Sequence, residues 1–505
     1  MSSPPPSPVY LIGAGPGDPG LLTLRGRDLL ARADVVLYDY LANPRLLEHA
    51  RADAELTCLG RHGQGRLLGQ DEVNAAMIAA ARSGRTVARL KGGDCTIFGR
   101  LAEEVAALEA AGIPYEVVPG VTAAAAASAY AGVPLTHRDA ASCVAFVTGQ
   151  QSDAKTGAPL DLAALARFPG TLVFYMGVTG APRWAPELIT HGKSAATPAA
   201  IVRHASLPQQ WIKQTTLGEL ANELAPGKVR PPAIIVVGDA VAASGASRWF
   251  ARRPLLGQTV LVTRPAHQAA GMVAQLEELG ARALVQPAIE IGPPADPAPL
   301  HAAIERLGDF HWVVFSSANG VAYFLDALQA SGRDLRALGG VKLAAIGPAT
   351  VAALAQRGLA ADVQPDEYRA EQLATALEPA AAAGEHFLLV RASRGRETLH
   401  DDLTAAGGSV TQAVAYESRD VTAAEPTIAE QLAAGEIDWV TATSSAIARS
   451  LVALFGDSLH RTKLAAISPL TAGVLTDAGL DVAAVAEQYT SDGLIEALAA
   501  SAAAE

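Results

Sequence analysis

The stretch GAGPGDPG, Gly13 to Gly20, joins the apolar run VYLI to the helix-like segment LLTLRGRDLLARAD. A glycine-rich turn between a strand and a helix is typical of nucleotide-binding α/β proteins. A dinucleotide fingerprint requires Gly-x-Gly-x-x-Gly and an acidic residue about 20 positions later. Asp39 fits that acid, but Asp18 stands where the third glycine belongs. Pro16 and Pro19 also lack the backbone N–H groups that bind phosphate, so the turn favours an uncharged or zwitterionic ligand.

Length and composition describe a multidomain protein with large cores. A chain of 505 residues, half of them hydrophobic and 18% charged, predicts roughly two to four domains. The net charge of -12 argues against a general nucleic-acid binder. An anionic small molecule remains compatible with it, because local arginine clusters dominate at contact distance. Cys58, Cys95 and Cys143 match no metal or redox spacing, so we expect no metal and reduced thiols.

Targeting signals are not evident in the sequence. No run of about 18 strongly apolar residues is present, so we expect no membrane span. The start, MSSPPPSP, has neither a basic region nor an apolar stretch, and residues 1–8 are predicted to be a flexible tail. We therefore expect a cytoplasmic protein.

Short β-branched runs alternate with alanine- and leucine-rich helical stretches along the chain, which predicts α/β layers. The pattern lapses in the small-residue and basic stretch VAASGASRWFARRPLLGQ, and a new strand series starts at TVLVTRP. We place a domain boundary near residue 250. The strand candidates before it are VYLI, DVVLYD, TVARL, YEVV, VAFVTG, TLVFYM and AIIVVG.

The second half contains a weak internal repeat. WVVFSSANGVAYFLDAL begins at Trp312, and WVTATSSAIARSLVALF begins at Trp439. Each is followed by a similar unit, which begins KLAAIGP at Lys342 and KLAAISP at Lys463. Two similar lobes that face each other would leave a cleft for a ligand. The serines in the turns are either ligand contacts or helix caps.

A second glycine turn occurs in RLKGGDCTIFGRLAEE, Arg89 to Glu104. Gly92 and Gly93 follow a strand and permit close backbone approach, and Asp94 offers a carboxylate for hydroxyls or an amine. Together with PGVTA, these turns describe a pocket built from several loops. A dinucleotide-binding domain would concentrate its phosphate contacts in one.

These motifs resemble those of the uroporphyrinogen-III C-methyltransferases, which are tetrapyrrole methylases that use S-adenosylmethionine. The resemblance runs from about Val9 to Gly238 and implies a methylase domain over 9–245. It further implies a two-lobed α/β homodimer that methylates two ring carbons of uroporphyrinogen III, giving precorrin-2 for sirohaem or cobalamin. The segments that carry it are GAGPGDPGLLTL, DVVLYD, RLKGGDCTIFGR, VVPGVTAA, AYAGVPLTHRD and TLVFYMGV.

The resemblance also assigns residues. It implies Asp39 as the base, and a ring carbon would attack the sulfonium methyl in line before a carboxylate takes the released proton. Arg100, Glu103 and Arg138, with the adjacent His137, would contact the macrocycle. The methyl-donor contacts fall on Pro16, Gly92, Gly93, Asp94, Ile97, Thr122, Ala123, Met176 and, where the family has glycine, Ala205.

Each assignment has an alternative. Asp39 could cap a turn, Met176 could be core packing, and His137 with Arg138 could be a surface pair. The sequence also departs from the family pattern at several positions. The family's proton-donating lysine falls on Arg61, and arginine hardly gives up a proton. The other departures are Cys95 after KGGD, Gln150 after VTG and Tyr40 after Asp39.

The second half resembles uroporphyrinogen-III synthase, from about residue 257 to 500, after a linker over 246–256. That resemblance implies a bilobal α/β fold that closes hydroxymethylbilane with loss of water and inversion of the last ring, without a cofactor. Tyr416 matches a tyrosine proposed to help the hydroxyl leave, although it could be a packing residue. Hydroxyls and N–H groups at helix starts would hold the polyanion. The substrate-binding candidates are Arg264, Ser316, Ser317, Asn319, Arg391, Arg394, Arg396, Thr443, Ser444 and Ser445.

The sequence therefore predicts a bifunctional tetrapyrrole enzyme that acts on hydroxymethylbilane and uroporphyrinogen III. Two alternatives stay open. One is a dinucleotide-dependent oxidoreductase, against which the missing third glycine argues. The other is a tetrapyrrole-binding or synthase-only protein with a decayed methylase lobe, which the changes at Arg61 and Gln150 would favour.

Overall fold

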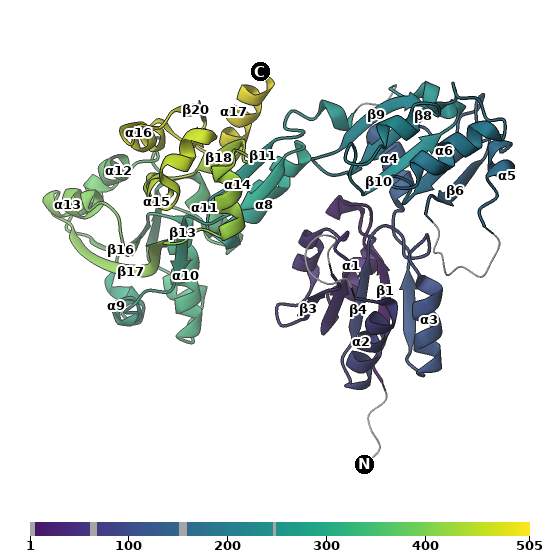
Figure 1. Cartoon of the computed structure of the whole chain (residues 1–505). Coiled ribbons are helices and arrows are strands. Elements are labelled where there is room, and N and C mark those ends of the chain that lie inside the picture. Colours follow the sequence, from purple (N-terminus) through teal and green to yellow (C-terminus); the bar gives the residue numbers. More distant parts are fainter. Residues whose placement is uncertain (1–5, 61–67, 151–158, 246–248, 505) are drawn as a thin grey trace, which may run out of the picture. The chain divides into compact units, whose positions relative to one another are not determined.

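The computed structural model describes residues 6–60, 68–150, 159–245 and 249–504. The chain divides into two compact units (Figure 1). One comprises residues 1–258 with 276–282 and 502–505, and the other comprises 259–275 and 283–501. Within the described ranges, every helix is too short or too polar to cross a bilayer.

The first lobe of the first unit is a five-stranded parallel sheet in the order β3-β2-β4-β1-β5. Successive side chains of a strand point to opposite faces. Leu11 therefore packs with Met77 and Leu108 on one face, and Ile12 packs with Leu29 on the other. The elements are β1 (Val9–Gly13), α1 (Leu24–Leu30), β2 (Val35–Tyr38), β3 (Glu55–Cys58), α2 (Gln70–Arg82), β4 (Val87–Lys91), α3 (Leu101–Ala110) and β5 (Tyr115–Val118).

The second lobe has a mixed sheet in the order β6-β7-β10-β8-β9, in which only the β6–β7 pair is parallel. Trp184 stacks on Phe174 at 3.9 Å on one face, and Ala127 packs against Val173 on the other. The elements are α4 (Ala123–Ala131), β6 (Val144–Thr148), α5 (Leu162–Ala166), β7 (Thr171–Tyr175), α6 (Ala181–Thr190), β8 (Pro198–Arg203), β9 (Trp211–Thr216), α7 (Leu220–Glu223) and β10 (Ala233–Val237).

The described part of the predicted linker packs onto the methylase-like unit. The indole N–H of Trp249 donates to the carbonyl of Ala129 at 3.0 Å. The rings of Trp249 and Phe250 both lie 5.0 Å from the ring of Tyr130. Residues 249–252 are therefore anchored by aromatic contacts, which small-residue composition alone did not predict.

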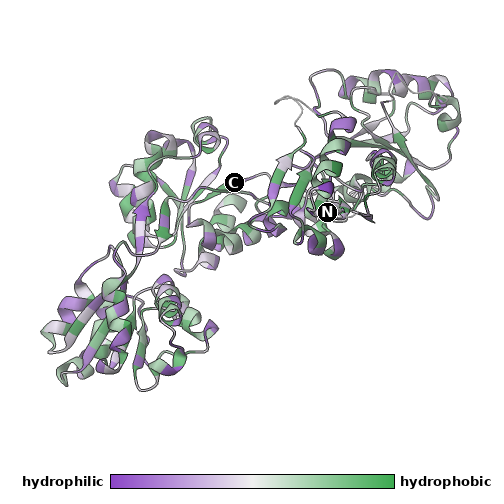
Figure 2. Ribbon diagram, turned by 90° about the horizontal axis from the view of Figure 1, so that it is seen from below, coloured by the Kyte–Doolittle hydropathy of each residue, from purple (hydrophilic) through white to green (hydrophobic). Residues whose placement is uncertain are grey.

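The second unit contains two further five-stranded sheets, β12-β11-β18-β19-β20 and β13-β17-β16-β14-β15. β13 pairs with β17 in the antiparallel sense, whereas the pairs β11–β18, β18–β19, β19–β20, β14–β15, β14–β16 and β16–β17 are parallel. In Figure 2, much of the strand ribbon has the green colour of hydrophobic residues. Their bounds are β11 (Thr259–Val262), β12 (Arg282–Val285), β13 (Ile289–Gly292), β14 (Trp312–Phe315), β15 (Lys342–Ala345), β16 (His386–Ala392), β17 (Ser409–Asp420), β18 (Trp439–Ala442), β19 (Lys463–Ala466) and β20 (Val482–Val485).

Helices lie between most of these strands, as crossovers between parallel strands require, whereas β13 follows β12 directly and belongs to the other sheet. The helices are α8 (Ala266–Glu278), α9 (Ala298–Glu305), α10 (Ala318–Ala330), α11 (Pro348–Gln356), α12 (Ala370–Ala382), α13 (Thr398–Ala405), α14 (Pro426–Ala433), α15 (Ser445–Phe455), α16 (Pro469–Asp477) and α17 (Ser491–Ala503).

The internal repeat is present in the structure, with one copy in each sheet. The first copy forms β14, α10, β15 and α11, and the second forms β18, α15, β19 and α16. Ser317 and Ser444 occupy equivalent helix N-caps: the Oγ of Ser317 accepts from the N–H of Gly320 at 3.0 Å, and that of Ser444 from the N–H of Ile447 at 3.2 Å. The capping interpretation of these two serines is therefore correct, and a second role for either would be additional.

Candidate functional site

Three loops of the first unit meet at the carboxyl ends of β1, β4 and β5. The N–H of Gly15 donates to the carbonyl of Gly93 at 3.1 Å, and the reverse bond is 2.7 Å. A Cβ atom on Gly13 would lie 2.5 Å from the backbone nitrogen of Gly120. These glycines are needed because the loop backbones touch, and a side chain at Gly13 would clash with the backbone of Gly120.

Side chains from both lobes hold the opening loop. Asp18 accepts from the N–H of Gly20 at 2.8 Å and from the hydroxyl of Tyr130 at 2.9 Å, and its own N–H donates to Ser206 Oγ at 3.0 Å. Asn43 Nδ2 donates to the carbonyl of Gly17 at 2.7 Å. Burial, followed by the bond to Asp18, raises the pKa of Tyr130, so its hydroxyl stays a donor. The loop is rigid for these reasons and, at Pro16 and Pro19, poor in N–H donors.

Asp94 fastens the second glycine turn. One of its carboxylate oxygens accepts from both the N–H and the hydroxyl of Thr96 at 2.6 Å, and the other accepts from the N–H of Gly120 at 3.3 Å. The carboxylate therefore fixes the shape of the pocket, in addition to any ligand contact.

The wall near β7 combines hydroxyls with apolar groups. The hydroxyls of Thr122 and Tyr175 lie 2.6 Å apart, and Tyr175 also accepts from the N–H of Ala124, next to Ala123, at 3.0 Å. Met176 has φ +50 and is 52% exposed, so it is not a core-packing residue. Ile97 and Ala205 pack on the α4 side of the sheet. Left-handed backbone at a non-glycine residue is strained and concentrates at functional sites.

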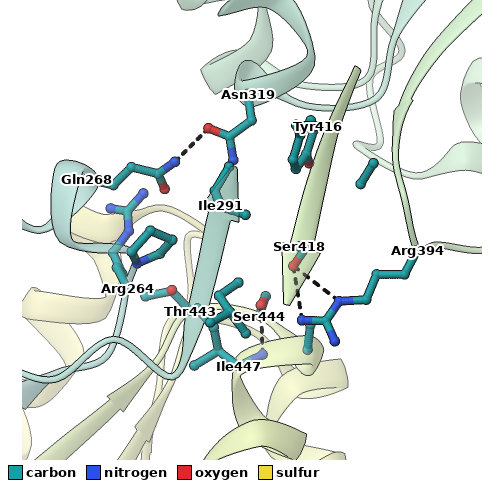
Figure 3. Close-up of a pocket in the computed structure, with 14 residues that line it drawn as sticks. Arg264, Gln268, Ile291, Asn319, Arg394, Tyr416, Ser418, Thr443, Ser444 and Ile447 are labelled. Carbon is teal, nitrogen blue, oxygen red and sulfur yellow. Dashed lines mark hydrogen bonds between the residues drawn. The ribbon is translucent and has the colours of Figure 1, made fainter. Parts of the chain in front are cut away.

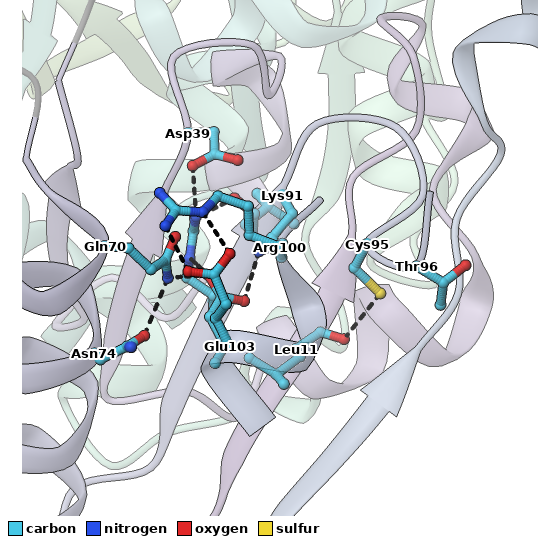
Figure 4. A network of polar contacts seen from close by, with 12 residues as sticks. Leu11, Asp39, Gln70, Asn74, Lys91, Cys95, Thr96, Arg100 and Glu103 are labelled. Carbon is cyan, nitrogen blue, oxygen red and sulfur yellow. Dashed lines mark hydrogen bonds and ion pairs between the residues drawn. The ribbon is translucent and has the colours of Figure 1, made fainter. Parts of the chain in front are cut away.

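Asp39 is held by an ion pair that the sequence did not reveal (Figure 4). Its Oδ1 accepts from Arg89 Nη2 at 2.6 Å. Arg89 Nε donates in turn to Glu104 at 3.2 Å, and Lys91 Nζ donates to the other oxygen of Glu104 at 2.5 Å. Glu104 also accepts from Gln70 Nε2 at 3.2 Å. Arg89 and Lys91 are two residues apart on β4 and so share a face, which was the available sequence signal.

The remaining predicted residues that the structure describes in this unit are exposed or half-buried. Arg100 precedes α3 and forms a surface ion pair of 2.5 Å with Glu103. His137 is half-buried and joins Ala141 through backbone hydrogen bonds, whereas Arg138 is exposed. Arg61 lies outside the described residues. At the other family departures, Gln150 is exposed, and Cys95 is fully buried with its Sγ 3.5 Å from the carbonyl oxygen of Val118.

A cavity of about 290 Å³ lies within the second unit, between the two sheets (Figure 3). The structure brings several predicted residues together there, and it adds Gln268 and Ser418, which the sequence analysis did not single out. Ser316, Ser317 and Ser445 are not among the lining residues. The lining polar side chains are Arg264, Gln268, Asn319, Arg394, Tyr416, Ser418, Thr443 and Ser444.

The predicted arginine cluster divides in the structure. Arg394 lines the cavity, where it donates to Ser418 Oγ at 3.1 Å and pairs with Asp420 at 2.8 Å. Arg391 instead pairs with Glu397 at 2.5 Å and also donates to Gln412, and Arg396 pairs with Glu371 at 2.6 Å. Those two guanidinium groups already have carboxylate partners within the protein, so they are poorly placed to meet a substrate.

Arg264 is the cation that the cavity leaves without a carboxylate partner among the described residues. Its Nη1 donates to Ser491 Oγ at 2.7 Å. Burial lowers the pKa of the Arg264 guanidinium, which nevertheless stays charged at neutral pH. On the opposite lobe, Asn319 Oδ1 accepts from Gln268 Nε2 at 2.6 Å and closes one side of the cavity.

Comparison with known proteins agrees with both halves of this picture. Residues 8–221 match the tetrapyrrole (corrin/porphyrin) methylases, and residues 270–496 match uroporphyrinogen-III synthase HemD. The fold and these matches define a two-domain enzyme of tetrapyrrole biosynthesis, with a methyltransferase domain followed by a synthase domain. The chain belongs to the family of the porphyrin biosynthesis protein HemD of Ruminiclostridium josui, with which it is 33% identical over 493 residues, 97% of each chain. The predicted family resemblance and α/β fold class are thus confirmed.

Two further relatives match part of this chain. The uroporphyrinogen-III C-methyltransferase of Bacillus subtilis is 39% identical over 363 residues, 72% of this chain and 74% of that protein. The siroheme synthase of Sodalis glossinidius is 47% identical over 250 residues, 50% of this chain and 52% of that protein. Membership of this family rules against the dinucleotide-dependent oxidoreductase.

Proposed function

We propose that the synthase domain cyclises hydroxymethylbilane to uroporphyrinogen III, and that the methylase domain methylates this product twice to give precorrin-2 for sirohaem or cobalamin. The domains would span 9–245 and 257–500, with 246–256 as linker. The names of the Bacillus subtilis and Sodalis glossinidius relatives support the methylase substrate and the sirohaem branch. The order of reactions supports the fusion, because the product of one domain is the substrate of the other.

The observation that carries the methylase half is the placement of Asp39 beside the close-packed glycine loops. β2 and β4 are adjacent and parallel, so their carboxyl ends share one edge of the sheet. A Cβ on Gly92 would lie 2.9 Å from the Cβ of Leu41, two residues after Asp39. The backbone packed at Gly92 and Leu41 lies next to the carboxylate of Asp39. This arrangement suits transfer of a methyl group to a carbon nucleophile, which needs a base but no nucleophilic side chain.

The residues present fit S-adenosylmethionine as the methyl donor. Its amino-acid portion is a zwitterion and its sulfonium is electrophilic at the methyl carbon. Main-chain groups around Gly93, Thr122 and Ala123 can approach it closely, and Met176 can contact its adenosine. The ring carbon forms its bond to the methyl carbon as the sulfur–carbon bond breaks, and Asp39 takes the proton that the ring then releases. The donor leaves as S-adenosylhomocysteine.

In the synthase half, the cavity offers hydroxyls and one guanidinium, that of Arg264, for which the described residues supply no carboxylate partner. Arg264 would meet a carboxylate of the polyanionic substrate, and the N–H groups at the starts of α10 and α15 would meet others. The hydroxyl of Tyr416 would donate to the departing hydroxide. Loss of hydroxide leaves an azafulvene cation on the substrate. The other end of the bound tetrapyrrole then attacks this cation and closes the ring with loss of a proton, so one water is lost overall.

The test uses the full chain with hydroxymethylbilane and S-adenosylmethionine. We expect a product two methyl groups heavier than uroporphyrinogen III, with two molecules of S-adenosylhomocysteine released per product. Formation of uroporphyrinogen III without methylation would contradict the methylase half and favour a decayed lobe. Formation of the uninverted type I isomer alone would contradict the synthase half. Sedimentation of the same sample tests the proposed homodimer.

A further inference from the structure

Three buried charged side chains form a network with Asp39 (Figure 4). The side chain of Glu104 is fully buried, and those of Lys91 and Arg89 are 3% and 6% exposed. The side chain of Asp39 is 32% exposed. Asp39 is therefore the one member of this charged quartet, Asp39–Arg89–Glu104–Lys91, that can reach a substrate.

The quartet is electrically balanced, with two carboxylates against two cations. Burying charges is costly unless each finds a partner of opposite sign with good geometry. Glu104 meets this condition by accepting from three side chains, Arg89, Lys91 and Gln70. Burial, then repulsion by Arg89, lowers the pKa of Lys91, and attraction to Glu104 opposes this. Such an expensive arrangement does not serve packing, since apolar residues would fill the same volume more cheaply.

Arg89 bridges the two carboxylates. Its Nε donates to the buried Glu104 of α3 and its Nη2 donates to Asp39, so the planar guanidinium couples the position of Glu104 to that of the partly exposed carboxylate. Its Nη1 also donates to the carbonyl of Leu90 at 3.2 Å. The orientation of Asp39 is thus set by a rigid group that is fixed at three points.

We propose that Arg89 and Glu104 are positioning residues for methyl transfer: they hold one oxygen of the Asp39 carboxylate, and leave the other to take the proton released from the methylated ring. This rests on the proposed function. Arginine keeps its own proton, so the charge of Arg89 is constant through both methylations and favours return of Asp39 to the anion.

Further titratable groups lie close to the quartet and enter the electrostatic balance. Glu103 of α3 interacts with Lys91, Arg100 just before α3 interacts with Glu104, and Tyr40 interacts with Asp39. Removing the Arg89 cation favours a protonated carboxylate, which moves the acid limb of the pH–rate profile to higher pH. Removing the Glu104 anion leaves an excess of positive charge and moves that limb to lower pH. A merely structural role would not produce shifts of opposite sign.

The experiment measures methylation of uroporphyrinogen III by the full chain as a function of pH, with S-adenosylhomocysteine binding followed separately. We expect Arg89→Ala to lower kcat about 10- to 100-fold, with donor binding retained. Added guanidinium should restore part of this loss, and Arg89→Lys should be intermediate. Glu104→Gln should shift the acid limb in the opposite direction to Arg89→Ala. The control is Arg85→Ala, which removes a surface ion pair to Glu55 in the same lobe and should leave the rate unchanged.

Wild-type kcat and pH profile in Arg89→Ala would overturn the proposal, as would equal shifts of the same sign in Arg89→Ala and Glu104→Gln. If Arg89→Ala does not fold, kcat and the acid limb of the pH–rate profile are compared between Arg89→Lys and Glu104→Gln instead. Asp39→Asn separates the two levels of inference. If Asp39→Asn is inactive while the Arg89 and Glu104 variants keep the wild-type kcat and pH profile, only the positioning role is refuted. A fully active Asp39→Asn refutes the base itself, and the proposed positioning with it.

Discussion

The Oγ atom of Ser317 lies 3.0 Å from the hydroxyl oxygen of Tyr416. Ser317 caps α10 and Tyr416 belongs to β17, and Tyr416 lines the cavity of the second unit while being only 7% exposed. Its ring stacks on that of Tyr323 at 5.8 Å. The phenol is thus fixed by a hydroxyl partner and a ring partner, and Tyr416 is one of the residues that line the cavity. Simple packing would not require that hydroxyl contact.

Tyr416→Phe should lower kcat of hydroxymethylbilane cyclisation about 10- to 100-fold with little change in KM, because it removes only the proposed hydrogen-bond donor to the leaving group. Discrimination of type III from type I product by chromatography, after correction for spontaneous closure, measures this. Ser317→Ala should give a smaller loss together with about 1 kcal/mol of destabilisation from the missing cap. Glu425→Ala, which removes the cap of α14 on the exposed surface, should cost similar stability with unchanged kcat. Full activity of Tyr416→Phe would remove the hydroxyl from the mechanism.

Arg264→Gln should raise KM for hydroxymethylbilane about tenfold or more, since the proposed partner of a substrate carboxylate is lost. Its stability should be unchanged or higher, because the free protein no longer holds a half-buried cation without a carboxylate partner. Steady-state kinetics and thermal unfolding of the same samples give both numbers. Arg396→Gln is the matched comparison, as its guanidinium is exposed and paired with Glu371. Equal KM values for wild type and Arg264→Gln would exclude this contact.

The sequence predicted most of the parallel framework. Each strand proposed in the first half is present, because short β-branched and aromatic runs between turn residues are distinctive whether they are fully buried, as in β4, β7 and β10, or partly exposed, as in β5 and β6. The strands it missed, β3, β8 and β9, have polar or alanine-rich sequences such as ELTC, PAAIVR and WIKQTT. β8 and β9 form by antiparallel pairing with neighbours and β3 by pairing with β2, which local composition does not encode.

The candidate sites divide in a similar way. Motifs located the loops and Tyr416, because glycine turns and serine caps leave local signatures. Sequence motifs could not identify the partners of the charged residues. Arg89 lies 50 residues from Asp39 in the chain, and Arg391 reaches Glu397 only because the turn between them brings them together. The same limit explains why Gln268, which reaches Asn319 across 51 residues, went unnoticed.

Trp249→Ala should lower the stability of the first unit by about 1–2 kcal/mol, because it removes two ring contacts and the hydrogen bond to Ala129. Since Tyr130 also donates to Asp18, we further expect weaker S-adenosylhomocysteine binding. Calorimetric unfolding and titration of the full chain measure the two effects. Trp211→Ala, at a similarly exposed indole on β9 for which no ring contact is found among the described residues, is the control. Equal unfolding temperatures for both variants would show that the linker contact contributes nothing.

Cys95 predicts a specific alkaline dependence of stability. Burial first, and then the nearby Asp94 carboxylate, raises the pKa of the Cys95 thiol to about 11 from its ordinary value of 9.0. Above about pH 9 the unfolded chain releases this proton while the folded chain retains it. The contribution of the Cys95 thiol to the free energy of unfolding is therefore complete at neutral pH and falls as the pH rises toward 11. At about pH 10 the loss is about 1 kcal/mol. Denaturant unfolding of the first unit should therefore give a lower free energy of unfolding at about pH 10 than at neutral pH. This difference should be smaller in Cys95→Ala and unchanged in Cys58→Ala, where the thiol is exposed. The same alkaline drop in Cys95→Ala would assign the effect to another group.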